Sequence, residues 1–238
     1  MMRMGARPGR APSAVASIMS FTIPDHVSFC MVGDEPVFLD VNRDRYFRLE
    51  PKLAAVFSQL CTTDGAAARY RAELARLLQT RVVVPSSEDS PPQPARDFIP
   101  DQSLVEEFSP LGTPRARLTV EMLIGLLHVR RAIRRGRLPA LLRRVRENKA
   151  DLDLDSSPTA ASLVTCCLAS RRLLPIAPNC LTDSLALSSL LIRRRIPFEL
   201  VFGVRLSPFA AHCWLQNSEF VFNDSLGSVL DFKPILVI

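Results

Sequence analysis

The spacing of apolar residues in the first ninety positions predicts a small module of three strands followed by helices. Apolar residues alternate with polar or small ones at 27–31 and again at 37–41, and Gly33-Asp34 between these runs is a hairpin signal. A third strand is predicted at 45–49. After Pro51 the apolar spacing changes to the helical period, at 53–60 and again at 70–78. These elements form one predicted unit over residues 21–84.

The second half of the chain shows helical spacing first and strand-like alternation afterwards. Helices are predicted at 120–133, 138–145 and 160–174, and another runs from Cys180 to the arginines at 193–195. Three strands are predicted after it, at 198–204, 210–216 and 220–222. The expected fold class is therefore α+β, with a helical segment ahead of the final helix and strands.

Two segments lack a pattern that would bury a core. Residues 85–100 contain five prolines, which is typical of a semi-rigid linker. Residues 1–20 carry three arginines and no acid, and their apolar part is too short for a secretory signal. They are expected to form a disordered tail, or else to precede a true start at Met19. The predicted boundaries are a tail at 1–20, a module at 21–84, a linker at 85–100 and a domain at 101–238.

Composition is that of a globular protein of ordinary size. The chain has 238 residues, of which 47% are apolar and 23% charged, so it is long enough for two modest domains. We expect no membrane span, because no apolar stretch approaches the roughly 20 residues that a spanning helix needs. Six cysteines stand at 30, 61, 166, 167, 180 and 213, without CxxC pairs or a disulfide-like spacing. This usage favours the reducing cytoplasm.

The positive charge is concentrated between Glu121 and Ala150. Nine arginines and lysines lie there against two glutamates, a local excess of seven, while the whole chain carries only +6. Such a run is either a solvated helix face or a docking surface for an acidic peptide or partner protein. We expect no nucleic-acid partner, because the run lacks interleaved aromatic residues that would stack on bases.

Three residues of the last quarter suggest a catalytic site. Cys180 follows Pro178-Asn179 and should occupy the first turn of a helix, where the helix dipole lowers a thiol pKa and free N–H groups can receive an oxyanion. His212 lies in the second of the predicted strands, and Asp224 follows the third. A thiol nucleophile, an imidazole base and an orienting carboxylate are the parts of a cysteine hydrolase or acyltransferase.

Each of these residues also has a simpler interpretation. A lone cysteine is usually buried in the core, a lone histidine is usually structural, and Asp224 stands in a turn sequence. A zinc site would need Cys180, His212 and Cys213, with Cys166 or Cys167. Strand alternation places Cys213 on the opposite face from His212, so we expect no metal.

The residues around the three candidates resemble lasso-peptide leader peptidases, the transglutaminase-like microcin-processing cysteine proteases. The resemblance lies in Asn-Cys-Leu-Thr-Asp-Ser-Leu-Ala-Leu at 179–187, Phe-Gly-Val-Arg at 202–205, Pro-Phe-Ala-Ala-His-Cys-Trp at 208–214, Asn-Asp at 223–224 and Phe-Lys-Pro-Ile at 232–235. It implies a transglutaminase/papain-like α+β core with Cys180 as nucleophile, His212 as general base and then acid, and Asp224 as orienting acid. Cys213 departs from the pattern, since a small residue such as alanine is expected there. No Gln precedes Cys180 as an oxyanion donor, so the Cys180 N–H is the candidate for that role.

The first module is similar to the PqqD-like peptide-recognition fold, a winged-helix module of three strands plus helices. The similarity lies in Val-Phe-Leu-Asp at 37–40 and Arg-Tyr-Phe-Arg-Leu at 45–49. It implies that a leader peptide adds a strand to the sheet. The residues expected to bind the leader are Arg45, Tyr46, Phe47, Tyr70 and Leu74.

The two resemblances together imply a cytoplasmic protease that cuts the leader from a ribosomally made lasso precursor. The implied partners are that precursor and an asparagine-synthetase-like cyclase, which closes the macrolactam after the cut. No cofactor is expected, and the chain has no GxxxxGK[ST] nucleotide-binding motif. Two alternatives stay open: an acyltransferase or transglutaminase of the same fold, and a non-enzymatic protein. The non-enzymatic protein would be a scaffold that delivers the precursor to the cyclase or, despite the lack of stacking aromatic residues, a winged-helix nucleic-acid binder that uses the basic run at 130–149.

Overall fold

The computed structural model describes residues 20–62, 70–86, 91–108, 112–149 and 158–238. Eight helices and ten strands lie within these ranges, so the fold is a mixture of α and β structure, as predicted. The tail expected at 1–20 falls outside them except for its last residue. None of the described helices is long and apolar enough to cross a membrane.

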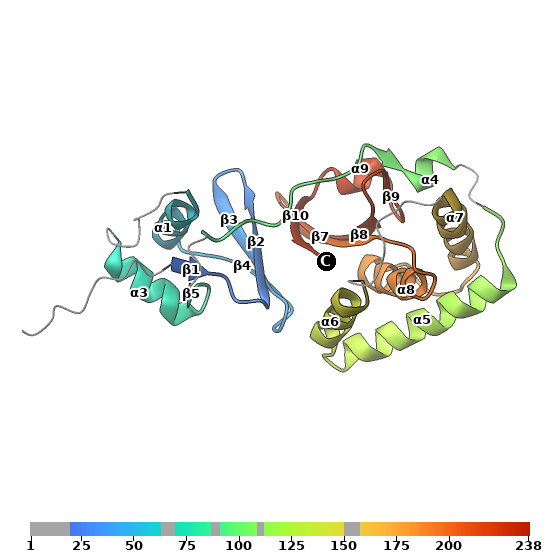
Figure 1. The fold of residues 1–238 in the computed structure, drawn as a ribbon, viewed down its shortest axis with the longest axis horizontal. Helices are drawn as coiled ribbons and strands as arrows, with labels where there is room; N and C mark the ends of the chain where they lie inside the picture. The colour runs from blue at the N-terminus through green and yellow to red at the C-terminus, as the bar shows by residue number, and fades with distance from the viewer. Residues whose placement is uncertain (1–19, 63–69, 87–90, 109–111, 150–157) are drawn as a thin grey trace, which may run out of the picture.

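The N-terminal module is built on an antiparallel sheet of three strands, packed on one face by two helices (Figure 1). Its strands follow the sequence order β2, β3, β4, and Gly33 takes a positive φ of 60° in the two-residue turn between the first two. Phe29 and Phe38 of the sheet meet Phe57 of the first helix, each with ring centroids 5.0 Å apart. A further short strand pair, β1 and β5, closes the module. The bounds are β1 Ser20–Thr22, β2 Val27–Val32, β3 Glu35–Asp40, β4 Arg45–Arg48, α1 Pro51–Thr62, α3 Arg71–Thr80 and β5 Val84–Ser86.

The C-terminal part is a curved five-stranded sheet with helices against it (Figure 1). The strand order is β10, β7, β8, β9, β6, and every pair is antiparallel except β6 with β9. Helix α8 packs on the sheet, and α5 lies across α6, α7 and α8. The bounds are β6 Gln102–Ser103, α4 Leu104–Glu107, α5 Ala116–Arg134, α6 Leu138–Lys149, α7 Pro158–Arg172, α8 Cys180–Arg193, β7 Glu199–Leu206, β8 Phe209–Gln216, β9 Phe220–Val221, α9 Leu226–Val229 and β10 Lys233–Val237. The strands β1, β5, β6 and β10 have no counterpart among the predicted elements.

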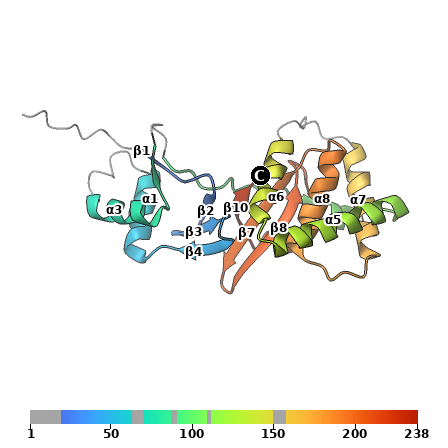
Figure 2. The same cartoon turned by 90° about the horizontal axis from the view of Figure 1, so that it is seen from below.

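The two sheets share one hydrophobic core. Cys30, Val37 and Leu39 of the N-terminal sheet pack into the same buried cluster as the residues of α8, β7 and β10. Strand β2 lies beside β10, as Figures 1 and 2 both show. The N-terminal module is therefore seated on the C-terminal sheet by the face that its own helices leave uncovered.

The proline-rich segment contacts both parts of the molecule. Residues 91–100 contain no helix or strand, yet the Ala95 N–H donates to the Phe29 carbonyl 2.8 Å away. Arg96 forms an ion pair with Glu199 at 3.1 Å, and the Phe98 carbonyl accepts a hydrogen bond from Gln216 at 3.0 Å. These contacts hold the segment against β2, β7 and β8.

Candidate active site

Helix α8 begins at Cys180, and its first turn is stabilised by side chains on both sides of that residue. Asn179 caps the helix: its Oδ1 accepts the Thr182 N–H at 3.0 Å. Asp183 accepts the Asn179 N–H at 3.1 Å. These bonds satisfy N–H groups that a helix start leaves free, so they fix where the helix begins and therefore where the Cys180 thiol points.

A partly buried ion pair fixes the same turn to the neighbouring helix. Arg171 of α7 donates from its Nε to Asp183 Oδ1 at 2.9 Å, and a second guanidinium nitrogen donates to the Ile176 carbonyl at 3.0 Å. Both charged side chains are largely shielded from solvent, with 11% and 21% exposed. Removal of one partner would leave the other charge uncompensated, which is why such a pair holds its geometry.

His212 projects from β8 and is held between an acid and two aromatic rings. Its Nε2 lies 2.6 Å from Asp224 Oδ2, which leaves Nδ1 for the Cys180 thiol. The imidazole stacks on Trp214 with centroids 5.9 Å apart and lies 5.1 Å from the Phe232 ring. The structure thus brings together the three residues that the sequence singled out, at the junction of α8 with β8 and the end of β9.

Hydrogen bonds and charges stabilise the ionised form of all three groups. Hydrogen bonding to His212 is the main cause of the lowered pKa of Cys180, and it outweighs the opposing effect of burial. Burial favours neutral His212, but the hydrogen bonds with Asp224 and Cys180 raise its pKa to about 9. Burial likewise opposes ionisation of Asp224, yet the bond from His212 lowers its pKa. The arrangement favours a thiolate–imidazolium pair, the nucleophilic form of a cysteine enzyme.

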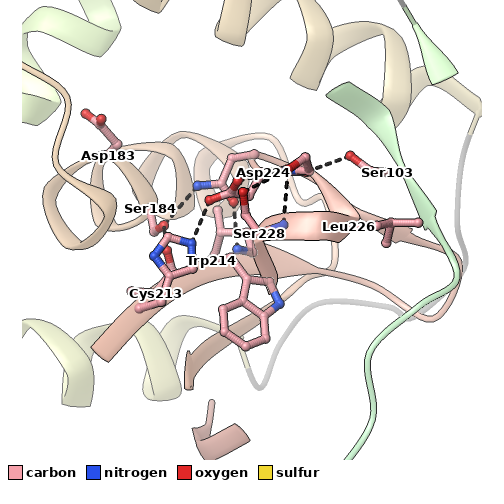
Figure 3. A network of polar contacts seen from close by, with 12 residues as sticks. Ser103, Asp183, Ser184, Cys213, Trp214, Asp224, Leu226 and Ser228 are labelled. Carbon is pink, nitrogen blue, oxygen red and sulfur yellow. Dashed lines mark hydrogen bonds and ion pairs between the residues drawn. The ribbon is translucent and has the colours of Figure 1, made fainter. Parts of the chain in front are cut away.

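Asp224 is held from behind by a segment more than a hundred residues earlier in the chain. Ser103 is buried, and its hydroxyl donates to the Asp224 backbone carbonyl at 2.6 Å (Figure 3). The same hydroxyl accepts the Val105 N–H at 3.2 Å. Nearby, Glu106 accepts the Leu226 N–H at 3.2 Å. The Ser225 N–H donates to Asp224 Oδ1 at 2.8 Å. These contacts fix the loop that presents the carboxylate to His212.

Asn223 and Gly203 are further supports that the sequence motifs did not identify as such. The Asn223 side chain accepts the Leu215 N–H at 2.7 Å and donates to Ser184 at 2.9 Å, so it ties β8 to α8. Gly203 lies opposite His212 in the β7–β8 register.

Ser103 begins a Ser-x-x-Glu pattern, which signals a helix start. No sequence signal places it beneath Asp224.

The other thiols differ from Cys180 in their surroundings. Cys213 is buried on the α8 side of β8, away from the Trp214 face, and burial raises its pKa. Burial also raises the pKa of Cys30 and Cys167 to about 12 and that of Cys61 to about 11. Within the described ranges, no group of three or more His, Cys, Asp and Glu side chains is placed to hold a metal ion.

A groove of about 520 Å3 runs between β4 and α3 of the N-terminal module. Of the residues expected to bind a leader there, Arg45 and Phe47 line the groove. Tyr70 and Leu74 instead pack with the core of that module. Tyr46 lies on the other face of β4, where its ring meets Phe209 of β8 at 5.7 Å. The structure therefore brings two of the five to one groove and directs Tyr46 toward β8, the strand that carries His212.

The pKa directions predict a bell-shaped dependence of kcat/KM on pH. Activity should rise as Cys180 ionises, below the ordinary pH range of a thiol, and fall near pH 9 as His212 loses the proton that the leaving group needs. Asp224→Asn removes a cause of the raised His212 pKa, so the alkaline limb should move to lower pH. Initial rates over a pH series test this, and an alkaline limb that Asp224→Asn leaves in place would contradict it.

The C-terminal half of the chain is similar to a known protein family. Residues 123–237 match the model of the transglutaminase-like superfamily. The matched range contains Cys180, His212 and Asp224, whereas Ser103 and the N-terminal module lie outside it. No significant match was found among curated proteins or among solved structures. A transglutaminase-like domain supports cysteine-based protease or acyltransferase chemistry.

Proposed function

We propose that this chain is a cysteine endopeptidase that removes the leader from a ribosomally made lasso-peptide precursor. The observation that carries the chemistry is the arrangement of His212, with Asp224 on one ring nitrogen and the Cys180 thiol on the other. The thiolate attacks the scissile carbonyl, and imidazolium protonates the leaving amine. Water then hydrolyses the acyl-enzyme with His212 as base.

Backbone N–H groups at the start of α8 support a role in stabilising the oxyanion. The Cys180 thiol already interacts with the N–H groups of Leu181 and Cys213, which contribute to its lowered pKa. Free N–H groups at a helix start concentrate positive potential, which favours the negative charge of a tetrahedral intermediate. The Cys180 N–H is the donor we assign to that intermediate.

The groove beside β4 supports a peptide substrate that binds away from the scissile bond. Strand β4 is an edge strand among the described residues, so an extended peptide can pair with its free side. The groove is basic: Arg43, Arg45, Arg48, Arg76 and Arg81 line it against Asp40 and Glu50. A leader with acidic side chains suits this lining, and the Tyr46–Phe209 contact joins the peptide-binding strand to the strand of His212.

A cleavage assay with the full chain and a synthetic precursor tests this proposal. Arg45 is exposed and has no ion-pair partner among the described residues, so its charge is available to an acidic leader. Arg45→Glu should therefore raise KM for the precursor roughly tenfold and leave kcat nearly unchanged. A short peptide that spans only the cleavage site should be cut equally by both proteins. Arg135 is also exposed and lies outside this groove, so Arg135→Glu is the matched control. Equal KM values for the wild type and Arg45→Glu would show that this groove does not bind the leader.

An acyltransferase is the second candidate, because the match to the transglutaminase-like superfamily supports protease and acyltransferase chemistry alike. Both functions share the acyl-enzyme and differ in what attacks it, water or an amine. Mass spectrometry of the product formed with an added primary amine separates them. Hydrolysis alone supports the protease, and amine incorporation at the new carboxyl end supports the acyltransferase.

A further inference from the structure

Helix α5 has a second apolar face that nothing in the described structure covers. Its buried face, formed by Leu118, Met122, Leu126, Val129 and Ala132, packs toward the core. On another side Val120, Ile124 and Leu127 are 54%, 62% and 55% exposed. Their spacing of four and three residues places them along one line of the helix. We call these three residues the α5 stripe.

A cavity lies directly beside the α5 stripe. It has a volume of about 510 Å3 and lies between α5, α6 and α8, with Ile124 in its wall. Leu141 and Ile192 add apolar surface from the other two helices. We call this cavity the α5–α6 groove. An apolar line next to a concave apolar groove is the form of a surface that receives a helix.

The charges around this surface are positive and largely uncompensated. The line of the stripe continues at the same spacing to Arg131 and Arg134, and Arg144 lies in the groove wall. None of these three arginines forms an ion pair with a described residue. Glu121 is the acid of the groove, and its pKa is lowered by bonds from Arg194 at 2.7 Å and Arg117 at 3.0 Å despite the opposing effect of burial.

We propose that the α5 stripe and the α5–α6 groove dock an acidic amphipathic helix of another protein. That helix would place apolar side chains, three and four residues apart, against Ile124 and Leu127. Its acidic residues would face Arg131, Arg134 and Arg144, whose charges lack partners among the described residues. The apolar stripe gives nucleic acid no complementary surface, and the groove is concave where a bilayer surface is flat. The proposal is independent of the activity assigned to Cys180.

Fluorescence anisotropy with the full chain tests the proposal. The probe is a labelled helical peptide of about 20 residues, with leucines at three- and four-residue spacing and flanking glutamates. We expect saturable binding that weakens with added salt, and none for the same peptide with lysine in place of glutamate. Ile124→Glu and the double variant Arg131→Gln/Arg134→Gln should each weaken binding about tenfold.

Two matched variants control for general effects of the substitutions. Leu230 is as exposed as Ile124, so Leu230→Glu introduces the same charge at an unrelated apolar site. Arg172→Gln removes the charge of an exposed arginine at the end of α7, which lines neither groove. Both should bind the acidic peptide like the wild type. The proposal is overturned if the wild type does not bind the peptide or if Ile124→Glu binds it unchanged. It is also overturned if Ile124→Glu and Arg131→Gln/Arg134→Gln lose affinity for phosphatidylserine vesicles or duplex DNA instead of for the peptide.

Discussion

Replacing Cys180 with alanine should abolish leader removal while leaving leader binding intact. The thiolate is the nucleophile of the proposed reaction, and removing a member of a catalytic triad typically lowers kcat by roughly 10^4-fold or more. Cys180 is only partly buried, so the loss of its sulfur should leave little cavity. Cleavage followed by mass spectrometry, with peptide affinity from anisotropy, measures both quantities.

Cys213→Ala is the matched control for this variant. It removes the thiol adjacent to His212 in sequence, but that thiol is buried on the α8 side of the strand and burial raises its pKa. It should lower the free energy of unfolding modestly and keep cleavage within a few-fold of the wild type. Iodoacetamide should correspondingly label Cys180 first. Cleavage by Cys180→Ala at the wild-type rate would exclude the proposed nucleophile.

Substituting alanine for Gly203 should displace His212, the proposed base, through the two aromatic residues that pack on it. A Cβ at this position would lie 2.7 Å from the Trp214 ring and 2.8 Å from Phe232, closer than side chains tolerate. Trp214 and Phe232 must both shift, and because their rings pack on His212 we expect the imidazole to shift with them. We expect a loss of about 1–3 kcal/mol in stability from overpacking and a fall in kcat of up to about 100-fold.

The chain provides a direct readout of this displacement and a clean control. Trp214 is the only tryptophan in the sequence, so intrinsic fluorescence reports on the ring that must shift. A Cβ added at Gly227, which is exposed in helix α9, would meet no atom within 4 Å, so Gly227→Ala should leave fluorescence and rate unchanged. Unaltered fluorescence and kcat in Gly203→Ala would show that His212 does not depend on this packing.

Local patterns were sufficient for most of the individual elements. The three N-terminal strands, the helix that starts at Pro51 and the helix that starts at Cys180 lie where the sequence predicts them. Alternation and helical spacing depend on neighbours a few residues away, and caps such as Asn179 act within one turn. Elements that are short or lack alternation escaped prediction: β6 has two residues, and β10 contains a proline.

Such local patterns could not predict the residues that support the site from distant parts of the chain. Ser103 reaches Asp224 across 121 positions, and Gly203 is required because the Trp214 ring of β8 and the Cβ of Phe232 both lie where a side chain would be. The winged-helix identity of the first module, the leader and the cyclase remain predictions. The sequence predicted Tyr46 beside Phe47 in one binding surface, but adjacent residues of a strand face opposite sides. Tyr46 consequently meets β8 while Phe47 lines the groove.

The sequence by itself determined the order of the three candidate residues: a cysteine at a helix start, then a histidine on a strand and an aspartate just after the next strand. It determined also the basic run and the helices that carry it. Only the tertiary structure decided that the first sheet is seated on the second and that Ser103 and Gly203 support the site. Only the structure shows that no described residue covers the side chains of Val120, Ile124 and Leu127. The physical reason is that local periodicity selects elements, whereas the packing of distant side chains selects which faces of those elements meet.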